Sequence, residues 1–225
     1  MQPSHIAELL QPFLKTPLPE SQLNQLSAYL DLLLRWNARI NLTAVRQPEQ
    51  IITRHFGESI FAAHHLFPTD QPLPTIDQRP PTNDRLTDLG SGAGFPGLPI
   101  KICCPKLHVT LIESNQKKAT FLREVVRSLA LTDVAVFAER AESYSGDRAD
   151  LVTLRAVERF ADALPVAARL AAPGGRMALL IGEAQLATAR EALPQYKWDK
   201  PLPIPLSASR VLFVGHAVSV VRHAD

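Results

Sequence analysis

Four of the chain's ten glycines lie within eight residues, Gly90 to Gly97. The surrounding sequence is Asp88-Leu89-Gly90-Ser91-Gly92-Ala93-Gly94-Phe95-Pro96-Gly97. A concentration of glycine at one place indicates a turn that needs positive φ angles or brings its backbone close to a ligand. The apolar segment Arg85–Leu89 precedes this turn, and ligands of open α/β sheets bind at the carboxyl ends of strands. We therefore predict a cofactor-binding loop.

Two cofactors compete for this loop. Counted from Gly92, the sequence matches the Gly-x-Gly-x-x-Gly fingerprint of dinucleotide-binding folds. Counted from Asp88, it gives Asp-x-Gly-x-Gly-x-Gly, the turn that binds S-adenosylmethionine in α/β methyltransferases. A pyrophosphate needs N–H donors at the helix N-terminus, and Pro96 and Pro99 remove two of them. An acid such as Asp88 would favour the cationic methyl donor and repel a pyrophosphate, so both arguments favour S-adenosylmethionine.

Other residues with chemical potential say less about the reaction. Glu113 follows the apolar segment His108–Ile112 and suits a bidentate grip on ribose hydroxyls, which both cofactors carry. His64-His65 lacks the spacing that would place two metal ligands on one helix face, so we expect no metal. Cys103-Cys104 fits a pair of reduced thiols on a helix, because neighbouring cysteines rarely form a disulfide.

The composition is that of a folded chain, with 46% hydrophobic residues, 20% charged residues and a net charge of +2. No apolar run reaches the roughly 18 to 20 residues that span a bilayer, and the first residues lack the features of a signal peptide. We expect a cytoplasmic protein without membrane contact. Residues 35–54 and 101–127 are locally basic, and residues 139–162 are acidic. The basic segments either contact phosphates or are solvated helix faces.

The pattern of apolar residues changes along the chain. In residues 22–36 they recur at intervals of three and four, as in an amphipathic helix, and a second helix is expected to begin at Pro48. Five prolines fall within residues 68–84 and mark a loop. We therefore divide the chain into a helical extension (1–67), this Pro-rich loop (68–84) and a cofactor-binding domain (85–225).

Short strands alternate with helices after residue 84. Such alternation predicts an α/β fold in which helices cover both faces of a mainly parallel sheet. The predicted strands cover residues 85–89, 108–112, 134–138, 151–154 and 177–181, followed by an antiparallel pair at 210–216 and 217–221.

A second motif lies in the helical extension: Arg35-Trp36-Asn37-Ala38-Arg39-Ile40-Asn41-Leu42-Thr43. Together with the glycine turn, it resembles the bacterial methyltransferase family that modifies N7 of one guanine in 16S ribosomal RNA, also called glucose-inhibited division protein B. The resemblance runs over nearly the whole chain. Further matches are Val45-Arg46, Arg54-His55, Ser59-Ile60, Leu111-Ile112-Glu113-Ser114, Lys117-Lys118, Phe121-Leu122-Arg123, Arg140-Ala141-Glu142 and Arg155-Ala156.

This resemblance implies a Rossmann-like class I methyltransferase fold with a seven-stranded sheet and an N-terminal helical extension. It also implies S-adenosylmethionine as cofactor and the 16S ribosomal RNA of the small ribosomal subunit as partner, and we expect a monomer. Ala141 and Glu142 would flank the adenine, and Arg155 would reach the site from the fourth strand. The residues predicted to bind the cofactor are Gly90, Gly92, Phe95, Glu113, Ala141, Glu142 and Arg155.

Guanine N7 has a free lone pair at neutral pH, so methyl transfer needs no general base and depends mostly on alignment and desolvation. The residues predicted to act on the substrate are Arg155, Arg140, Asn41 and His55. The two arginines would hold the guanine O6 edge or a phosphate; alternatively, Arg140 pairs with Glu139 or Glu142. Asn41 and His55 either frame the target base or make capping and packing hydrogen bonds.

The sequence departs from the family pattern in two places. Residues 68–84 form a longer connection than the family pattern suggests, and Ile181-Gly182 stands where the family tends to place a lysine before glycine. Trp36 either stacks on a base or packs in the core.

Two other functions stay open. The competing functions are an NAD-dependent oxidoreductase and a non-catalytic RNA-binding protein on a methyltransferase scaffold.

Overall fold

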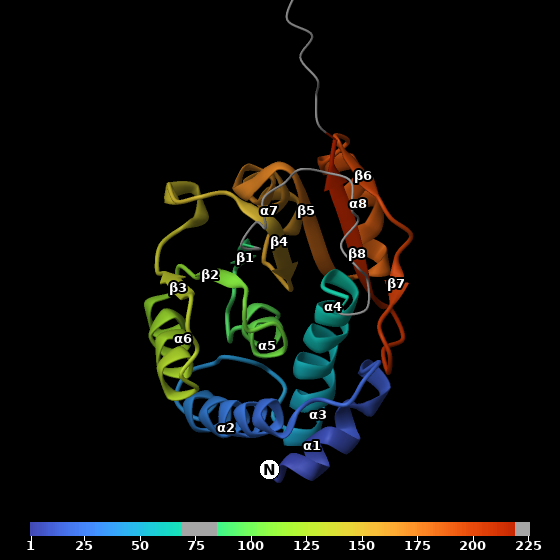
Figure 1. Ribbon diagram of the computed structural model, residues 1–225. Helices are drawn as coiled ribbons and strands as arrows, with labels where there is room; N and C mark the ends of the chain where they lie inside the picture. The colour runs from blue at the N-terminus through green and yellow to red at the C-terminus, as the bar shows by residue number, and fades with distance from the viewer. Residues whose placement is uncertain (69–84, 219–225) are drawn as a thin grey trace, which may run out of the picture.

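A computed structural model describes residues 1–68 and 85–218 of the chain. Its centre is an eight-stranded sheet in the order β3-β2-β1-β4-β5-β8-β6, with β7 paired to β8 (Figure 1). Strands β1 to β5 are parallel, β8 is antiparallel to β5, and β6 and β7 are antiparallel to β8. The strands are β1 Arg85–Leu89, β2 His108–Ile112, β3 Val134–Phe137, β4 Ala149–Arg155, β5 Ala171–Gly182, β6 Tyr196–Trp198, β7 Leu202–Pro203 and β8 Arg210–Ala217.

Helices cover both faces of this sheet. The N-terminal helices, with α5 and α6, pack on one face, and α7 and α8 pack on the other. In β5, Ala178 and Leu180 belong to the first core, and Met177, Leu179 and Ile181 belong to the second, as the two-residue period of a strand requires. The α-helices are α1 Pro3–Leu10, α2 Glu20–Asn37, α3 Pro48–Ile51, α4 Glu58–Leu66, α5 Gly97–Cys103, α6 Gln116–Ser128, α7 Phe160–Leu170 and α8 Leu186–Ala192.

Shorter helical turns connect several of these elements. A π-helical turn, Ile52–Gly57, joins α3 to α4, so the predicted second helix is a single winding segment with one widened turn. The remaining turns are of the 3-10 type: η1 Gln11–Phe13, η3 Ala141–Ser143 and η4 Glu183–Gln185.

The strand order reverses between β1 and β4. From β1 the chain continues to β2 and β3 on one side, and β4 and β5 lie on the other. A crevice therefore forms at the carboxyl ends of β1 and β4, which is where open α/β sheets bind ligands. The glycine turn follows β1 directly and enters this crevice.

The first five predicted strands and the α/β fold class are confirmed. The predicted pairing of residues 210–216 with residues 217–221 is wrong. Strand β8 extends through Ala217 and pairs with β5, β6 and β7. Residues 219–221 lie outside the described part. Strand β6 was missed because Tyr196–Trp198 is too short to show a period. The main path nevertheless contains the expected seven strands, and β7 is an additional two-residue strand.

The predicted division into a helical extension and a domain stays a prediction. One hydrophobic core joins residues of α1, α2 and α4 to Leu86, Val109 and Leu151 of the sheet. Most of the Pro-rich loop, residues 69–84, lies outside the described part. Cys103 and Cys104, at the end of α5, are reduced and form no disulfide, as expected. None of the described helices is long and apolar enough to cross a membrane.

Candidate functional site

Two cavities adjoin at the carboxyl ends of β1, β2 and β4. Cavity A has a volume of about 450 Å³ and lies between the ends of β1 and β2, the segment after β3 and the start of α7. Cavity B has a volume of about 570 Å³ and lies between the glycine turn, the end of β4 and the N-terminal helices. Both are lined by Gly90, Glu113, Ser114, Val157 and Glu158, so they form one continuous depression.

The glycine turn is held by its own backbone amides. Those of Gly90 and Ser91 donate to the carbonyl of Ile112, and that of Gly92 donates to Glu113 Oε2 at 2.9 Å. Gly92 has a φ of +57°, and a Cβ added there would face open space, 3.8 Å from the nearest backbone oxygen. Glycine at this position therefore leaves room in cavity B.

The start of α5 is closed in the same way. The amide of Gly97 donates to Asp88 Oδ2 at 3.3 Å, and that of Leu98 donates to the carbonyl of Gly94 at 2.8 Å. Pro99 follows and has no amide hydrogen to offer. These amides are engaged within the protein, so the turn does not present the N–H cradle that a pyrophosphate needs.

Asp88 has a different role from the one expected. Its side chain is 1% exposed, lines neither cavity, and accepts a 2.7 Å hydrogen bond from Thr153 as well as the amide of Gly97. Burial raises the pKa of Asp88 to about 6. Asp88 therefore makes no direct contact with a ligand in either cavity: its carboxyl group ties β1 to β4 and caps α5.

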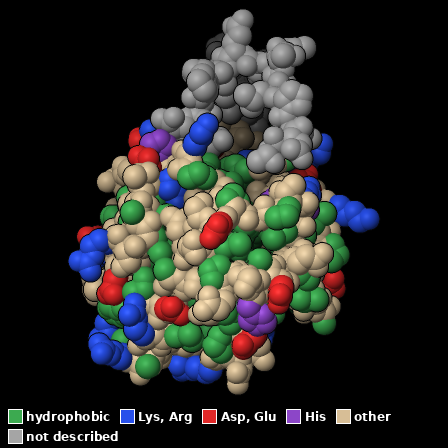
Figure 2. All heavy atoms as spheres, turned by 60° about the horizontal axis from the view of Figure 1, so that its bottom comes forward, with side chains coloured by type: hydrophobic (Ala, Val, Ile, Leu, Met, Phe, Trp, Pro, Cys, Tyr) green, Lys and Arg blue, Asp and Glu red, His purple; other side chains and the backbone are tan. Residues whose placement is uncertain are grey.

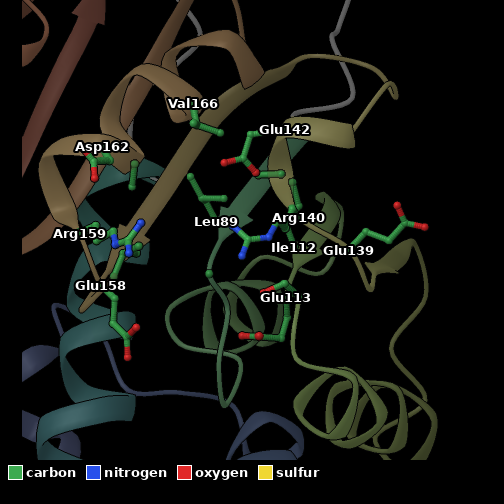
Figure 3. A pocket seen from close by; sticks show the side chains of 15 residues that line it. Leu89, Ile112, Glu113, Glu139, Arg140, Glu142, Glu158, Arg159, Asp162 and Val166 are labelled. Carbon is green, nitrogen blue, oxygen red and sulfur yellow. The ribbon is translucent and has the colours of Figure 1, made fainter.

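Cavity A is nevertheless acidic. Its apolar surface comes from side chains such as Leu89, Ile112 and Val166 (Figure 3). Figure 3 shows charged groups on both sides, from the segment after β3 and from the segment that leads into α7. The residues that line it carry two guanidinium groups, Arg140 and Arg159, and five carboxylates, Glu113, Glu139, Glu142, Glu158 and Asp162. This excess of carboxylates favours a ligand that is apolar in part and carries positive charge.

Glu113 stands at the border between the cavities. Its Oε2 accepts the amide of Gly92, and its Oε1 accepts the amide of Asn115 at 2.7 Å. The side chain is 8% exposed and lines both cavities. Each carboxylate oxygen can accept a second hydrogen bond, so Glu113 can hold the turn and still receive two hydroxyl groups from a ligand.

Phe95 forms an apolar wall of cavity B. It is 5% exposed and stacks on Tyr29, with ring centroids 5.5 Å apart. Phe56 meets it edge to face at 5.0 Å, and Tyr29 also donates a hydrogen bond to the carbonyl of Ala93. The glycine turn is thus anchored to α2 and to the π-helical turn.

Arg155 ends β4 and lies in the wall of cavity B. Its Nε and Nη2 donate to Glu58 Oε2 at 3.1 and 3.0 Å, and Arg210 Nε donates to the same oxygen at 3.0 Å. Arg155 Nη2 also donates to the carbonyl of Arg54 and lies 2.8 Å from His55 Nδ1. Arg155 therefore joins the π-helical turn to the sheet.

His55 is neutral in this environment. Burial and the positive charge of Arg155 lower its pKa to about 3. Its Nε2 lies 2.7 Å from the hydroxyl of Thr43, and both residues line cavity B. His55 thus acts in hydrogen bonds and not as a cation at neutral pH.

The predicted site residues line cavity A, cavity B or neither of them, and Gly90 and Glu113 line both. Asn41 lines neither cavity: it is exposed, and its Oδ1 accepts a 3.4 Å hydrogen bond from Arg46. Cavity A is lined by Gly90, Glu113, Arg140, Ala141 and Glu142, and cavity B is lined by Gly90, Gly92, Phe95, Glu113, His55 and Arg155.

Arg140 is thereby placed in cavity A and away from the wall that contains His55 and Arg155. The alternative interpretation of Arg140 as an ion-pair partner is not supported, since neither Glu139 nor Glu142 pairs with it among the described residues. Figure 3 shows its guanidinium group directed into cavity A.

Sequence reasoning missed several functional positions. In the second motif the buried asparagine is Asn37, whose Oδ1 accepts the amides of Leu42 and Thr43. Glu58 was also missed, because no local pattern marks a carboxylate that pairs with distant arginines. Trp36 packs in the core, as one of its two interpretations held: its Nε1 donates to Glu124, and its ring meets Phe121 edge to face.

The described residues contain no group of three or more His, Cys, Asp or Glu side chains that could hold a metal ion.

Comparison with known proteins identifies one family. Residues 22–204 match the family model GidB, described as rRNA small subunit methyltransferase G. A protein named Ribosomal RNA small subunit methyltransferase G from Listeria monocytogenes serotype 4b (strain F2365) is 36% identical over 184 residues, which cover 78% of this chain and 72% of the relative. A protein of the same name from Roseiflexus castenholzii is 39% identical over 209 residues, covering 88% of this chain and 84% of the relative.

Solved structures show the same fold at low sequence identity. TrmN from Thermus thermophilus superimposes with a TM-score of 0.53 at 20% identity, over 74% of this chain and 53% of that protein. Fibrillarin pre-rRNA processing protein from Methanococcus jannaschii gives a TM-score of 0.52 at 18% identity, over 61% of this chain and 67% of that protein. These likenesses confirm the expected fold.

Proposed function

Since the chain belongs to the GidB family of rRNA small subunit methyltransferases, we propose that it transfers a methyl group from S-adenosylmethionine to N7 of one guanine in 16S ribosomal RNA. The structural observation that carries this proposal is an acidic, partly apolar cavity that continues into a second cavity with room for a base. The first suits a cationic nucleoside, and the second suits the acceptor. An NAD-dependent oxidoreductase is not favoured, because the amides of the glycine turn are already engaged.

The residues of cavity A fit the adenosine part of the cofactor. Leu89, Ile112 and Val166 offer apolar contact to a purine, and Ala141 and Glu142 lie beside them in the segment after β3. Glu113 would accept the two ribose hydroxyls with the lone pairs that the amides of Gly92 and Asn115 leave over.

At the border with cavity B, the open space above Gly92 admits the amino-acid part of the cofactor. When bound, S-adenosylmethionine supplies a methyl group activated by its sulfonium. The sulfonium and amino groups would lie near the excess of carboxylates, which lowers the free energy of bound positive charge.

The protein then has to align the acceptor nitrogen and exclude water. Phe95 forms an apolar wall in cavity B and cannot compete for the guanine lone pair. His55, held neutral, adds no positive charge beside a base that becomes cationic. Alignment and desolvation of this kind are sufficient for a nucleophile that needs no deprotonation.

The ribosomal RNA would meet the basic segments of the chain. Lys118 lines cavity B, and α6 also carries Lys117, Arg123 and Arg127. Figure 2 shows lysine and arginine side chains gathered along the left edge of the molecule, the side on which α6 lies in Figure 1. Phosphate contacts at these residues would make RNA binding fall with salt. We propose that the enzyme acts as a monomer, without a metal ion, in the bacterial cytoplasm.

The test is incubation with labelled S-adenosylmethionine and small-subunit RNA that lacks the modification, free and within the subunit. We expect label on one guanine, at N7, in at least one of the two substrates. Label on neither would contradict the proposal. RNA binding without any transfer would favour the non-catalytic RNA-binding function.

A further inference from the structure

Thr43, a polar residue in the wall of cavity B, has its backbone held by Asn37. Asn37 is 6% exposed and grips the Thr43 backbone from both sides. Its Oδ1 accepts the Thr43 amide at 3.0 Å, and its Nδ2 donates to the Thr43 carbonyl at 3.0 Å. The position and direction of the Thr43 side chain are therefore set by a buried amide, although the residue lies in an irregular segment.

The hydrogen-bonding state of His55 follows from its other neighbour. Arg155 Nη2 lies 2.8 Å from His55 Nδ1, and a guanidinium group can only donate. Nη2 also donates to the Arg54 carbonyl and to Glu58 Oε2, so it shares its two hydrogens among three acceptors. We assign Nδ1 as the accepting, unprotonated nitrogen because a donor there would face the guanidinium at 2.8 Å, and a neutral ring then carries its proton on Nε2. This proton lies toward Thr43 Oγ1, at a nitrogen-to-oxygen distance of 2.7 Å. His55 is the donor in this contact.

Both lone pairs of the Thr43 hydroxyl are consequently occupied. One accepts from His55 Nε2, and the other accepts from the amide of Val45 at 3.1 Å. A hydroxyl has one proton and two acceptor positions. The remaining function of Thr43 Oγ1 is to donate its proton, and the residue lines cavity B. The arrangement thus presents a hydroxyl that donates and does not accept.

We propose that Thr43 is a specificity-determining residue, whose hydroxyl donates to O6 of the target guanine and rejects adenine. Guanine presents two acceptors, N7 and O6, on the edge that contains the methylated atom, whereas adenine presents the N7 acceptor and the N6 amino donor. An amino group facing a hydroxyl that cannot accept would be left unpaired. The inference rests on the proposed function and adds the means by which the base is selected.

The role of Thr43 is in selecting the base and not in activating it. A hydrogen bond to O6 withdraws electron density from the purine and does not make N7 more nucleophilic. We therefore expect its loss to appear in kcat/KM through weaker binding of the correct base, with discrimination between bases reduced. Ser114, Asn115, Lys118 and Arg155 also carry side-chain donors in the wall of cavity B, and the test has to separate Thr43 from them.

The experiment pairs two enzymes with two substrates. One substrate is small-subunit RNA with guanine at the methylated position, and the other has 2-aminopurine there, which keeps N7 but lacks O6. We expect wild-type kcat/KM to fall about tenfold or more on 2-aminopurine, the effect of one unpaired hydrogen-bonding group. In Thr43→Val, kcat/KM on the guanine substrate should fall by a similar factor. The kcat/KM values on the two substrates should then differ by less than about twofold.

An unchanged ratio between the two substrates in Thr43→Val would overturn the inference, because a merely structural role lowers both rates together. Thr43→Ser keeps the hydroxyl and should restore discrimination. Binding of S-adenosylhomocysteine by both variants checks that the fold is intact. If neither variant folds, wild-type enzyme that methylates 2-aminopurine as well as guanine still overturns the inference. Absence of wild-type activity on guanine would instead contradict the proposed function.

Discussion

Gly92 is the residue at which the backbone of the glycine turn leaves space for a ligand. Its amide donates to Glu113, its φ is +57°, and the space where a side chain would begin is open. We expect Gly92→Asp to weaken S-adenosylhomocysteine binding at least about 100-fold. The new carboxylate would fill this space and repel Glu113 at close range. Isothermal titration calorimetry measures the effect.

Gly92→Ala is the matched control for this substitution. A methyl group fits the open space, and its cost is that of a positive φ, about 1 kcal/mol. The alanine variant should therefore keep measurable binding. If Gly92→Asp binds the ligand as tightly as Gly92→Ala, the turn does not form the cofactor site.

His55 makes stability depend on pH. Its pKa is lowered from an ordinary value of 6.5 to about 3, so the unfolded state binds more protons between these values. The stabilisation is present above pH 6.5 and is lost as the pH falls toward 3. Between pH 7 and pH 5 we expect the free energy of unfolding to decrease by roughly 1–2 kcal/mol on account of His55. Urea denaturation at the two pH values measures this.

The comparison should use His55→Gln, in which this part of the pH dependence is absent. Asp88 titrates in an overlapping range with the opposite sign, because its raised pKa favours the protonated form in the folded state. Its contribution is common to both proteins and cancels in the difference. An equal slope in wild type and His55→Gln would contradict the prediction.

At the scale of elements, the joint between α4 and the sheet depends on Glu58. This carboxylate is 2% exposed and lies 3.0 Å from Arg155 on β4 and from Arg210 on β8. Glu58→Gln leaves Arg155, whose side chain is 10% exposed, and Arg210, whose side chain is 24% exposed, without their buried counter-charge. We expect it to lower the free energy of unfolding by about 3–5 kcal/mol, the usual cost of breaking a buried ion pair from one side. Urea denaturation at pH 7 checks this value.

Glu49→Gln provides the control on the same helical segment. Glu49 is exposed in α3, and its replacement should change stability by less than about 0.5 kcal/mol. Glu58→Gln should also slow methyl transfer, because Arg155 positions the π-helical turn that carries His55. If Glu58→Gln and Glu49→Gln were equally stable, the ion pairs of Glu58 with Arg155 and Arg210 would not be what holds α4 in place.

At the scale of the whole molecule, cofactor binding should stabilise both layers of the fold together. Cavity A is lined by β1, β2 and α7, and cavity B adds residues of the N-terminal segment. With S-adenosylhomocysteine at about 100 times its Kd, linkage predicts about 2.7 kcal/mol of stabilisation. For a chain of 225 residues this raises Tm by roughly 5–10 °C. Differential scanning fluorimetry measures the shift.

NAD is the control ligand in this measurement. It should leave Tm unchanged, because the amides of the glycine turn are engaged and cavity A is acidic. A shift with NAD and none with S-adenosylhomocysteine would favour the oxidoreductase that the glycine fingerprint also allows.

The sequence by itself determined the features that depend on short-range order. The stripe in residues 22–36, the strands β1 to β5 and the glycine turn were all predictable, because apolar periodicity and positive φ are local properties. The same holds for the family, since its motifs are continuous segments. Glu113 and Phe95 could be assigned to the site because each lies at a strand end or in the turn itself.

Only the tertiary structure decided which polar groups meet. Arg155 lies 97 residues from Glu58 and 100 residues from His55, and no local pattern connects them. Asp88 turns away from the cavities toward Thr153, 65 residues distant, because a buried carboxyl group must find hydrogen-bond donors. For the same reason the buried Asn37 organises Thr43, whereas Asn41 is left at the surface. Partners of this kind are selected by packing, which joins residues that are far apart in the sequence.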